Sequence, residues 1–244
     1  MIDGLLNANR WKVLFENFDM FTDGIVMTIK VAILGWLIAM VIGITFGILC
    51  TKKSKVIRGI IKVYVEFFQN TPLPLQIFFY YNGVPIIIKA IFNLSRPFRL
   101  SKLLIGSVGL GLYHGAYIAE VIRTGIEAVP KGQREAAESQ GFSELQTMIF
   151  IVIPQTLKMI LPPLTSQTLN LLKNTSVLAM IAGMDVMYYA DSFVSSYGYL
   201  QGYIVCAVMY FILCLPLALL ATHFEKRAKQ LPTEKKSRGK REVA

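Results

Sequence analysis

Charge is scarce in this sequence. Only 16% of its 244 residues are Asp, Glu, Lys or Arg, whereas a soluble domain averages about 25%. Hydrophobic residues make up 54% of the chain, and the mean hydropathy is +0.52. This balance excludes an ordinary soluble domain and indicates a protein that crosses a membrane several times.

Histidine and cysteine are also rare, which limits the chemistry open to the chain. The two histidines, His114 and His223, stand alone in the sequence, and isolated histidines argue against a metal cluster. The three cysteines lie in or beside apolar stretches, and their spacing is not that of metal ligands or of a structural disulfide. We therefore interpret Cys50, Cys206 and Cys214 as small packing residues.

Motifs typical of nucleotide-binding enzymes are missing. The chain has no GxxxxGKS or GxxxxGKT sequence, so it cannot bind ATP through a P-loop. Gly109, Gly111 and Gly115 do not have the spacing of a dinucleotide fingerprint, and their apolar surroundings predict close helix packing instead. The first apolar stretch has no basic segment before it and no small-residue cleavage site after it, so it does not have the features of a secretory signal.

Long apolar runs are what the sequence has instead. A helix needs about 20 residues to cross a bilayer core, and we predict five such membrane spans. Residues 31–50, 103–119 and 192–222 contain no charged residue at all. The other two spans, 60–81 and 158–181, carry Lys62 with Glu66 and Lys158 with Lys173.

Lysine and arginine favour one side of the membrane in this arrangement. Basic residues collect at 52–58, at 123–134 and at 224–244, and such an excess marks the inner side. We therefore predict the N-terminus outside and the C-terminus inside, although the outer segment 89–102 is more basic than the rule prefers. The charged tail from Glu225 has no apolar periodicity, so we predict that it is disordered. Its basic residues fix the topology or contact anionic lipid. The net charge of +10 therefore does not argue for binding of nucleic acid.

Apolar residues recur at helical spacing before the first span. Between charged residues, the set comprises Trp11, Leu14, Phe15, Phe18 and Phe21. Two interpretations fit this pattern: an amphipathic helix lying at the outer interface, or a helix packed on the bundle. We divide the chain accordingly into an amphipathic segment at 1–22, a membrane domain at 23–223 and a basic tail at 224–244.

A polar segment between the third and fourth spans, residues 126–154, has the features of two short helices. Pro130 and Gly132 break the helix that continues from the third span. A short helix then follows over 133–140. Gly141 ends it, because glycine accepts a positive φ at a helix C-terminus at no steric cost.

The first of these helices has a surface suited to a soluble partner. Ala136 and Ala137 present small side chains on its surface, which lets the helix fit closely into a groove. Glu135 can form an ion pair with a basic residue of that partner. A second short helix is expected to run to Ile153, with Pro154 closing it.

The spacing of this segment resembles a known motif. Glu135-Ala136-Ala137, then Gly141, then Ile151 to Pro154 are similar to the EAA loop of binding-protein-dependent ABC importer permeases, with Ile153 in place of the usual Leu. Further matches over residues 22–225 narrow the resemblance to permeases for polar amino acids. They include Ala116-Tyr117-Ile118-Ala119-Glu120, Leu172-Lys173-Asn174-Thr175-Ser176, and Asn70-Thr71-Pro72-Leu73 followed by Gln76. Gln69 departs from the pattern, because many relatives carry Arg there, so the role of that Arg does not carry over.

The resemblance implies an all-α membrane protein with the type I, MetI-like permease fold of ABC importers, with five transmembrane helices and a cytoplasmic coupling loop. It implies a multi-pass protein of the prokaryotic plasma membrane, paired with an identical or homologous second permease. An ATP-binding subunit, which holds the ATP and Mg, grips the loop, and an extracytoplasmic binding protein delivers the solute. No cofactor is expected in this chain. The residues assigned to coupling are Gln133, Arg134, Glu135, Ala136, Ala137, Gly141, Ile151 and Pro154.

Polar side chains inside the spans are candidates for the solute path, because such groups are costly in a bilayer core. Thr71-Pro72 interrupts the second span, and broken helices are tolerated at membrane depth where they line a cavity. The candidates for the path or gate are Asn70, Thr71, Gln76, Lys173 and Asn174. The rival interpretation is helix packing for Lys173 and a local ion pair with Lys62 for Glu66.

The predicted function is transport of a polar amino acid into the cell, driven by ATP hydrolysis in a separate subunit. The Asn-Thr-Pro-Leu segment and the cationic outer loop favour glutamate, glutamine or aspartate. Arginine, lysine, histidine or cystine is the alternative for the same system. A secondary amino acid transporter or channel is the alternative of another class, but it would need coupling carboxylates within the spans. The sequence offers only Glu66 and, near an inner end, Glu120.

Overall fold

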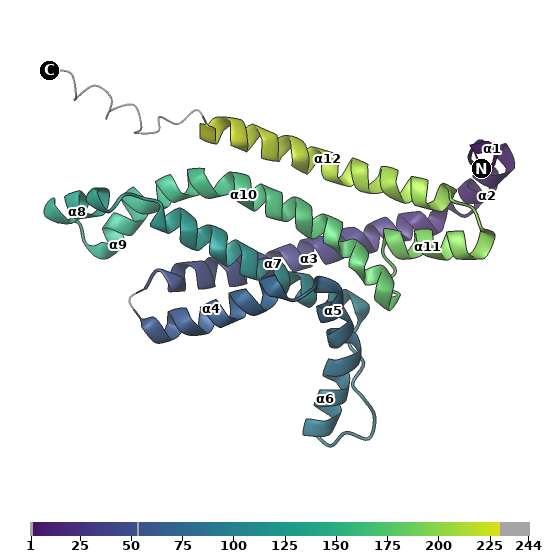
Figure 1. Ribbon diagram of the computed structural model, residues 1–244, viewed down its shortest axis with the longest axis horizontal. Helices are drawn as coiled ribbons and strands as arrows, with labels where there is room; N and C mark the ends of the chain where they lie inside the picture. The colour runs from purple at the N-terminus through teal and green to yellow at the C-terminus, as the bar shows by residue number, and fades with distance from the viewer. Residues whose placement is uncertain (1, 53, 230–244) are drawn as a thin grey trace.

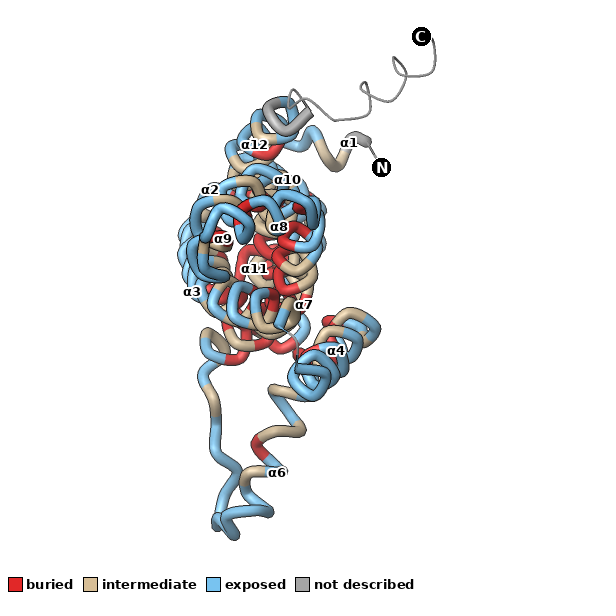
Figure 2. The backbone as a smooth tube through the Cα atoms, turned by 90° about the vertical axis from the view of Figure 1, so that its left-hand side faces the viewer, coloured by how far each residue is buried: buried red, intermediate tan, exposed pale blue. Residues whose placement is uncertain are grey.

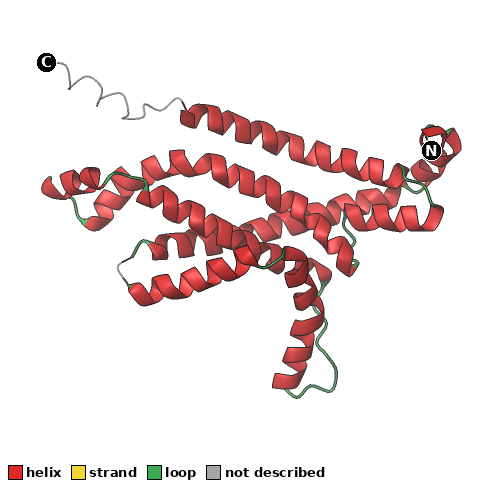
Figure 3. Cartoon of the chain, viewed as in Figure 1, coloured by secondary structure: helices red, strands yellow, loops and turns green. Residues whose placement is uncertain are grey.

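Helices are the regular structure of this chain. The computed structural model describes residues 2–52 and 54–229, and every regular element in these two ranges is a helix (Figure 3). The long helices run roughly along one direction and form an elongated bundle, whereas α6 (Val84–Ile91) projects from its side (Figure 1). The all-α fold predicted from the sequence is confirmed.

The chain enters the bundle through α1 (Ile2–Leu5), α2 (Ala8–Glu16) and α3 (Phe18–Cys50). Asn17 separates α2 from α3, so the apolar residues before the first span belong to two helices. Leu14 of α2 and Phe21 of α3 are fully buried, and the ring of Phe21 lies 5.9 Å from that of Phe193. This burial favours a segment packed on the bundle, and the boundary expected at residue 22 falls inside α3.

α7 (Lys102–Glu127) packs along α3 through small residues. α3 buries a small residue at every fourth position from Gly35 to Gly47. A Cβ at Gly47 would lie 2.5 Å from the Cβ of Ile122 in α7, so the two backbones approach closely only because glycine is there. Gly111 of α7 meets α3 in the same way, which confirms the close packing predicted for it.

The second predicted span is broken where the sequence predicted the break. Its parts are α4 (Lys55–Asn70), α5 (Leu73–Phe78), the π-helical turn η1 (Phe79–Gly83) and α6. Thr71 is extended, with φ −108° and ψ 133°. Proline has no N–H and pushes the residue before it out of the helical region, so Pro72 favours a break at this position.

The segment after α7 turns at Gly141 and then continues as one helical run, Glu144–Ile181, into the fourth span. It contains α8 (Lys131–Ser139), α9 (Glu144–Thr147), the π-helical turn η2 (Met148–Val152), α10 (Ile153–Asn174) and the 3-10 helix η3 (Thr175–Ile181). The prediction that Pro154 closes a short helix is wrong, because Pro154 lies in the first turn of α10. Proline fits there since the first N–H groups of a helix have no acceptor within it.

The fifth predicted span, 192–222, is divided in the structure. The two helices are α11 (Val186–Tyr197) and α12 (Gln201–Lys229). Gly198 ends α11 with a φ of +69°, and Asp185 begins it by accepting a hydrogen bond from the backbone N–H of Met187 at 3.1 Å. The last span therefore starts at Gln201, with the helix α12. The prediction placed its start too early, because the uncharged run continues across the turn at Gly198.

Three of the described helices are long and apolar enough to cross a membrane: Phe18–Cys50, Glu144–Ile181 and Gln201–Lys226. α7 packs on α3 and α10, and α4 packs on α7. The count of five spans and the outward N-terminus stay predictions. The tail predicted to be disordered begins inside α12, which is helical to Lys229; residues 230–244 lie outside the described residues.

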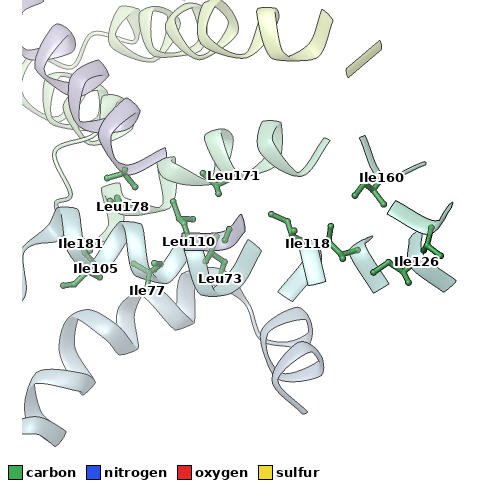
Figure 4. Packing of buried hydrophobic residues seen from close by; sticks show 14 of the residues in the cluster. Leu73, Ile77, Ile105, Leu110, Ile118, Ile126, Ile160, Leu171, Leu178 and Ile181 are labelled. Carbon is green, nitrogen blue, oxygen red and sulfur yellow. The ribbon is translucent and has the colours of Figure 1, made fainter. Parts of the chain in front are cut away.

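Two apolar clusters hold these elements together, and Figure 2 shows the buried residues along the middle of the bundle. The larger cluster joins α3, α5, α7, α10 and η3, and Figure 4 shows Ile77, Leu110, Leu171 and Leu178 in it. The smaller cluster joins α2 and the start of α3 to α11 and α12. Its members are Leu14, Phe21, Val186, Ala190, Phe193, Cys206 and Met209. Cys206 is thus a packing residue, as predicted.

Candidate coupling loop and solute path

α8 is a short helix with well-defined ends. It begins at Lys131, slightly ahead of the predicted start. Its C-terminus is closed by bonds from the backbone N–H of Gly141 to the carbonyl of Glu138 (3.0 Å) and from that of Phe142 to Ala137 (3.1 Å). Gly141 has a φ of +84°, a conformation that other L-residues rarely adopt. The predicted stop at Gly141 is confirmed.

One face of α8 is covered by its own chain and the other is exposed. α8 packs against α9 and η2, and Ala137 is only 5% exposed. The expectation that Ala137 lies on the surface is therefore wrong. Glu135 and Ala136 are exposed, so a carboxylate and a small methyl group face outward, where a second protein can contact them.

Two side-chain contacts attach α8 to the long helices on either side of it. Arg134 donates from Nη2 to the carbonyl of Ile126, near the end of α7, at 2.6 Å. Gln133 accepts at Oε1 a hydrogen bond from Nε2 of Gln155 in α10 at 2.6 Å. The same Nε2 donates to the carbonyl of Ile151 at 2.8 Å. These bonds involve three of the predicted coupling positions, Gln133, Arg134 and Ile151.

An exposed apolar patch lies just beyond α8, and the sequence reasoning missed it. Ser143 and Gln146 form a capping box that starts α9, with Gln146 Oε1 accepting from the backbone N–H of Ser143 at 2.8 Å. Leu145 is 68% exposed and Phe150 is 63% exposed. The sequence does carry a signal for this patch: a capping box, followed by apolar residues at helical spacing.

The polar residues at the break in the second span satisfy their own backbone. Gln76 is 4% exposed, and its Nε2 donates to the carbonyls of Phe68 (3.3 Å) and Thr71 (3.0 Å). Asn70 donates from Nδ2 to the carbonyl of Glu66 at 2.8 Å. Thr71 donates from Oγ1 to the carbonyl of the residue four positions earlier. The bonds from Thr71 and Gln76 take up carbonyls that the break leaves without a helical N–H.

Lys173 and Asn174, neighbours at the end of α10, have different surroundings. Asn174 Nδ2 lies 3.1 Å from Nε2 of His114, whose Nδ1 lies 3.2 Å from Oε1 of Gln167. His114 is 1% exposed, so it is a satisfied core residue. Lys173 is exposed instead. It lines a cavity of about 500 Å³ together with Ser176, Met187, Tyr203, Cys206, Ala207 and Tyr210.

A second cavity, of about 490 Å³, is rich in charged side chains from α4 and α7. Its lining consists of Cys50, Arg58, Lys62, Val65, Glu66, Gln69, Glu120, Arg123 and Glu127. Lys62 Nζ lies 3.5 Å from Glu66 Oε1, which confirms the predicted local ion pair. Arg123 donates to Glu120 from Nε at 3.0 Å and to Glu127 from Nη1 at 2.5 Å.

The sequence reasoning did not assemble this charged cavity. On α4, charged or amide residues recur three or four positions apart from Arg58 to Gln69, and on α7 they do so from Glu120 to Glu127. That spacing places each set on one helix face. This spacing can be found in the sequence. The contact between the two faces, however, follows only from the packing of α4 on α7. The break adjoins this cavity through Gln69, whereas Lys173 lines the other one.

Comparison with known proteins gives a consistent result. Residues 39–230 match the family described as "Binding-protein-dependent transport system inner membrane component". The "Probable glutamine ABC transporter permease protein GlnM" of Bacillus subtilis (strain 168) is 38% identical over 216 residues, which cover 88% of this chain and 96% of that protein. The "Putative glutamine transport system permease protein GlnP" of Rickettsia bellii (strain RML369-C) is 32% identical, with 88% and 94% covered.

Solved structures extend this similarity to the fold. A chain of the "Crystal structure of an amino acid ABC transporter with histidines" superposes with a TM-score of 0.77 at 31% identity, covering 88% of this chain and 97% of that one. A chain of the MetNI methionine ABC transporter in an inward-facing conformation gives a TM-score of 0.66 at 16% identity and supports the fold alone. The MetI-like fold expected from the sequence is confirmed.

Proposed function

The chain belongs to the family of binding-protein-dependent transport system inner membrane components, and from that premise we propose that it is the membrane permease that admits a polar amino acid, glutamine included, to a prokaryotic cell. It is a transport component rather than an enzyme, and ATP hydrolysis belongs to a partner ATPase. The observation that carries the proposal is α8, a short helix with an exposed face that is hydrogen-bonded to two long helices.

The proposed coupling surface is the exposed side of α8. Glu135 and Ala136 contact a groove of the ATPase, and Gly141 gives the tight turn that keeps α8 short. Ala137 supports the helix from its buried side. Leu145 and Phe150 add an apolar border to the polar helix, and such mixed surfaces are typical of protein interfaces. Ile151 and Pro154 form the junction through which α10 follows the movement of α8.

Displacement of α8 reaches the cavity through the bonds described above. Arg134 carries the movement to α7, and Gln133 with Gln155 carries it to α10. α7 supplies Glu120, Arg123 and Glu127 to the charged cavity. When two ATPase subunits close, they would therefore move one wall of that cavity. In this way ATP hydrolysis would control the access of the solute to the cavity.

The charged cavity and the adjoining break form the proposed solute path. A free amino acid carries an ammonium and a carboxylate, and this cavity offers both carboxylates and cations. Asn70 and Thr71 lie at the break, where the helix can bend, and Gln76 holds the break together from inside. Lys173, a further candidate for the path, lines a separate cavity with residues of η3, α11 and α12, and Asn174 keeps that end of α10 in place through His114.

Three partners complete the proposed transporter. They are an ATP-binding subunit at α8, an extracytoplasmic binding protein at the opposite end, and a second permease, identical or homologous, that encloses the path. A two-fold pair is the simplest closed arrangement of such subunits. Glutamine, glutamate and aspartate are the proposed solutes, and arginine, lysine, histidine or cystine is the alternative.

The test is uptake by the copurified complex in proteoliposomes. Labelled glutamine, glutamate, aspartate, arginine, lysine, histidine and cystine are offered with and without ATP on the ATPase side. The expected result is ATP-dependent uptake of glutamine that persists when ion gradients are dissipated. Uptake that follows an ion gradient and ignores ATP would overturn the proposal in favour of a secondary transporter.

A further inference from the structure

Residues 84–101 form an arm that leaves the bundle sideways, and we call this segment the lateral arm. It consists of α6 and an irregular return to the start of α7 (Figures 1 and 2). Asn93, two residues beyond the end of α6, has a φ of +47°, and the backbone N–H of Leu94 bonds to the carbonyl of Lys89 at 3.0 Å. The arm joins α7 at the end opposite α8, since α7 runs from Lys102 to Glu127 and then to α8.

The lateral arm is apolar and uncovered by its own chain. Ile86, Ile91 and Phe92 are 61%, 70% and 69% exposed, and Phe98 is 54% exposed. Pro85 is the one buried residue of the arm. Contiguous apolar surface of this kind does not normally face water and marks a contact with lipid or protein.

The lateral arm is also strongly cationic. Lys89, Arg96 and Arg99 are exposed, and the sequence has no acidic residue between Glu66 and Glu120. Lys102, just beyond the arm, is already used: its Nζ donates to the carbonyl of Ala182 at 2.6 Å. Lys89, Arg96 and Arg99 therefore lie among exposed apolar side chains, and the sequence offers no acidic residue nearby to neutralise them.

We propose that the lateral arm lies in the headgroup region of the leaflet opposite α8 and selects anionic phospholipid. The Ile and Phe side chains enter the acyl boundary, and Lys89, Arg96 and Arg99 bind lipid phosphate groups. Apolar residues mixed with cations are the composition of segments that lie in a membrane interface, and each cation adds attraction to anionic lipid. The proposal needs the chain to span a membrane and is independent of the coupling role of α8.

A second copy of this chain is a less suitable occupant of the same surface. Two arms meeting around a two-fold axis would bring together the cations Lys89, Arg96 and Arg99 of both copies, with no acidic residue of either arm to pair them. Like charges brought together in this way oppose association. Lipid phosphate instead supplies the negative charge that the arm lacks, which also explains why this outer segment is more basic than the topology rule prefers.

The experiment uses tryptophan quenching in the full complex with its ATPase, reconstituted in nanodiscs. A Phe92→Trp variant reports on the arm, and the signal of native Trp11 and Trp36 is subtracted with the unmodified complex. One sample contains brominated phosphatidylglycerol in unlabelled phosphatidylcholine, and the other contains brominated phosphatidylcholine in unlabelled phosphatidylglycerol, with the brominated lipid at equal mole fraction. A Leu37→Trp variant, on an exposed face of α3, is the lipid-facing control.

Selective binding of anionic lipid predicts that brominated phosphatidylglycerol quenches the tryptophan at position 92 about twofold or more as strongly as brominated phosphatidylcholine. The Leu37→Trp control should show no preference. Combining Lys89→Gln, Arg96→Gln and Arg99→Gln should remove the preference, and raising the salt concentration should weaken it. Equal quenching by both lipids would overturn the selectivity. Quenching by neither would show that protein covers the arm, and disulfide formation between Ile91→Cys copies would then identify a second permease.

Discussion

The helix break at Thr71–Pro72 and the one at Gly141 both occur at residue types that commonly end helices, yet they leave different surfaces behind. At the first, Gln76 is buried and takes up the freed carbonyls of Phe68 and Thr71. At the second, backbone bonds close the helix and Glu135 stays exposed. At a helix break within an apolar bundle, the freed carbonyls need a hydrogen-bond donor from the chain itself, because no water is there to supply one. A break outside it can keep side chains free for a partner.

A Gly141→Asp substitution tests the partner side of this comparison and should have the largest effect. A residue with a Cβ at a φ of +84° is strained by roughly 1–2 kcal/mol, and the new carboxylate lies beside the proposed coupling surface. We expect ATP-driven uptake to fall to background while the protein still inserts and the ATPase still hydrolyses ATP. Uptake into proteoliposomes and phosphate release are the two measurements.

Gly198→Asp is the matched control for backbone strain. Gly198 also has a positive φ, of +69°, and at both glycines a new Cβ would have no atom within 4 Å. It ends α11, far along the chain from α8. The control should lose some thermal stability and keep uptake coupled to ATP. Equal loss of uptake in both variants would assign the effect to strain alone.

Arg134→Met tests whether α8 acts through its bond to α7. A hydrogen bond from a charged donor contributes about 1.5–3 kcal/mol. If much of this couples α8 to α7, the uptake rate should fall by about tenfold, the factor that 1.4 kcal/mol represents. ATP hydrolysis should be retained. Lys131→Met removes a cation from the same helix without breaking a described bond, and it should leave uptake within a small factor; a similar loss there would point to charge rather than to attachment.

Gln76→Leu tests the other helix break, at Thr71–Pro72, where a buried side chain supplies the hydrogen bonds. The substitution leaves the carbonyls of Phe68 and Thr71 without their side-chain donor, which costs about 1–3 kcal/mol. For a protein of this size, each kcal/mol lowers the Tm by roughly 2–4 °C. Asn82→Leu is the control, because its exposed Nδ2 donates to the carbonyl of Phe78 at 3.2 Å, where water can replace it. An equal fall in Tm for both would contradict a special role for the buried amide.

Lys173→Met should have the smallest effect, because this lysine is exposed in its cavity. An exposed charge contributes at most about 1 kcal/mol, so the KM for glutamine should rise by no more than about fivefold. Lys158→Met, on the same helix α10, is the control and should leave the KM unchanged. Unchanged KM and rate in both variants would remove Lys173 from the solute path.

Sequence reasoning succeeded where neighbours along the chain decide the outcome. The stop at Gly141 follows from the φ it permits, the break at Pro72 from a missing N–H, and the Lys62–Glu66 pair from helical spacing. It failed at Pro154, where the same residue type closes one helix or begins another depending on what precedes it. It also failed within 192–222, where an apolar run gives no sign of the turn at Gly198.

By itself, then, the sequence determined the membrane class, the helical content and the short helix α8, because composition, sterics and spacing act over a few residues. Only the tertiary structure decided that Ala137 is covered, that Asn174 pairs with His114 from another helix, and that the charged faces of α4 and α7 meet in one cavity. Burial and pairing depend on which distant segments exclude water from a side chain. That exclusion exists only after the helices have packed.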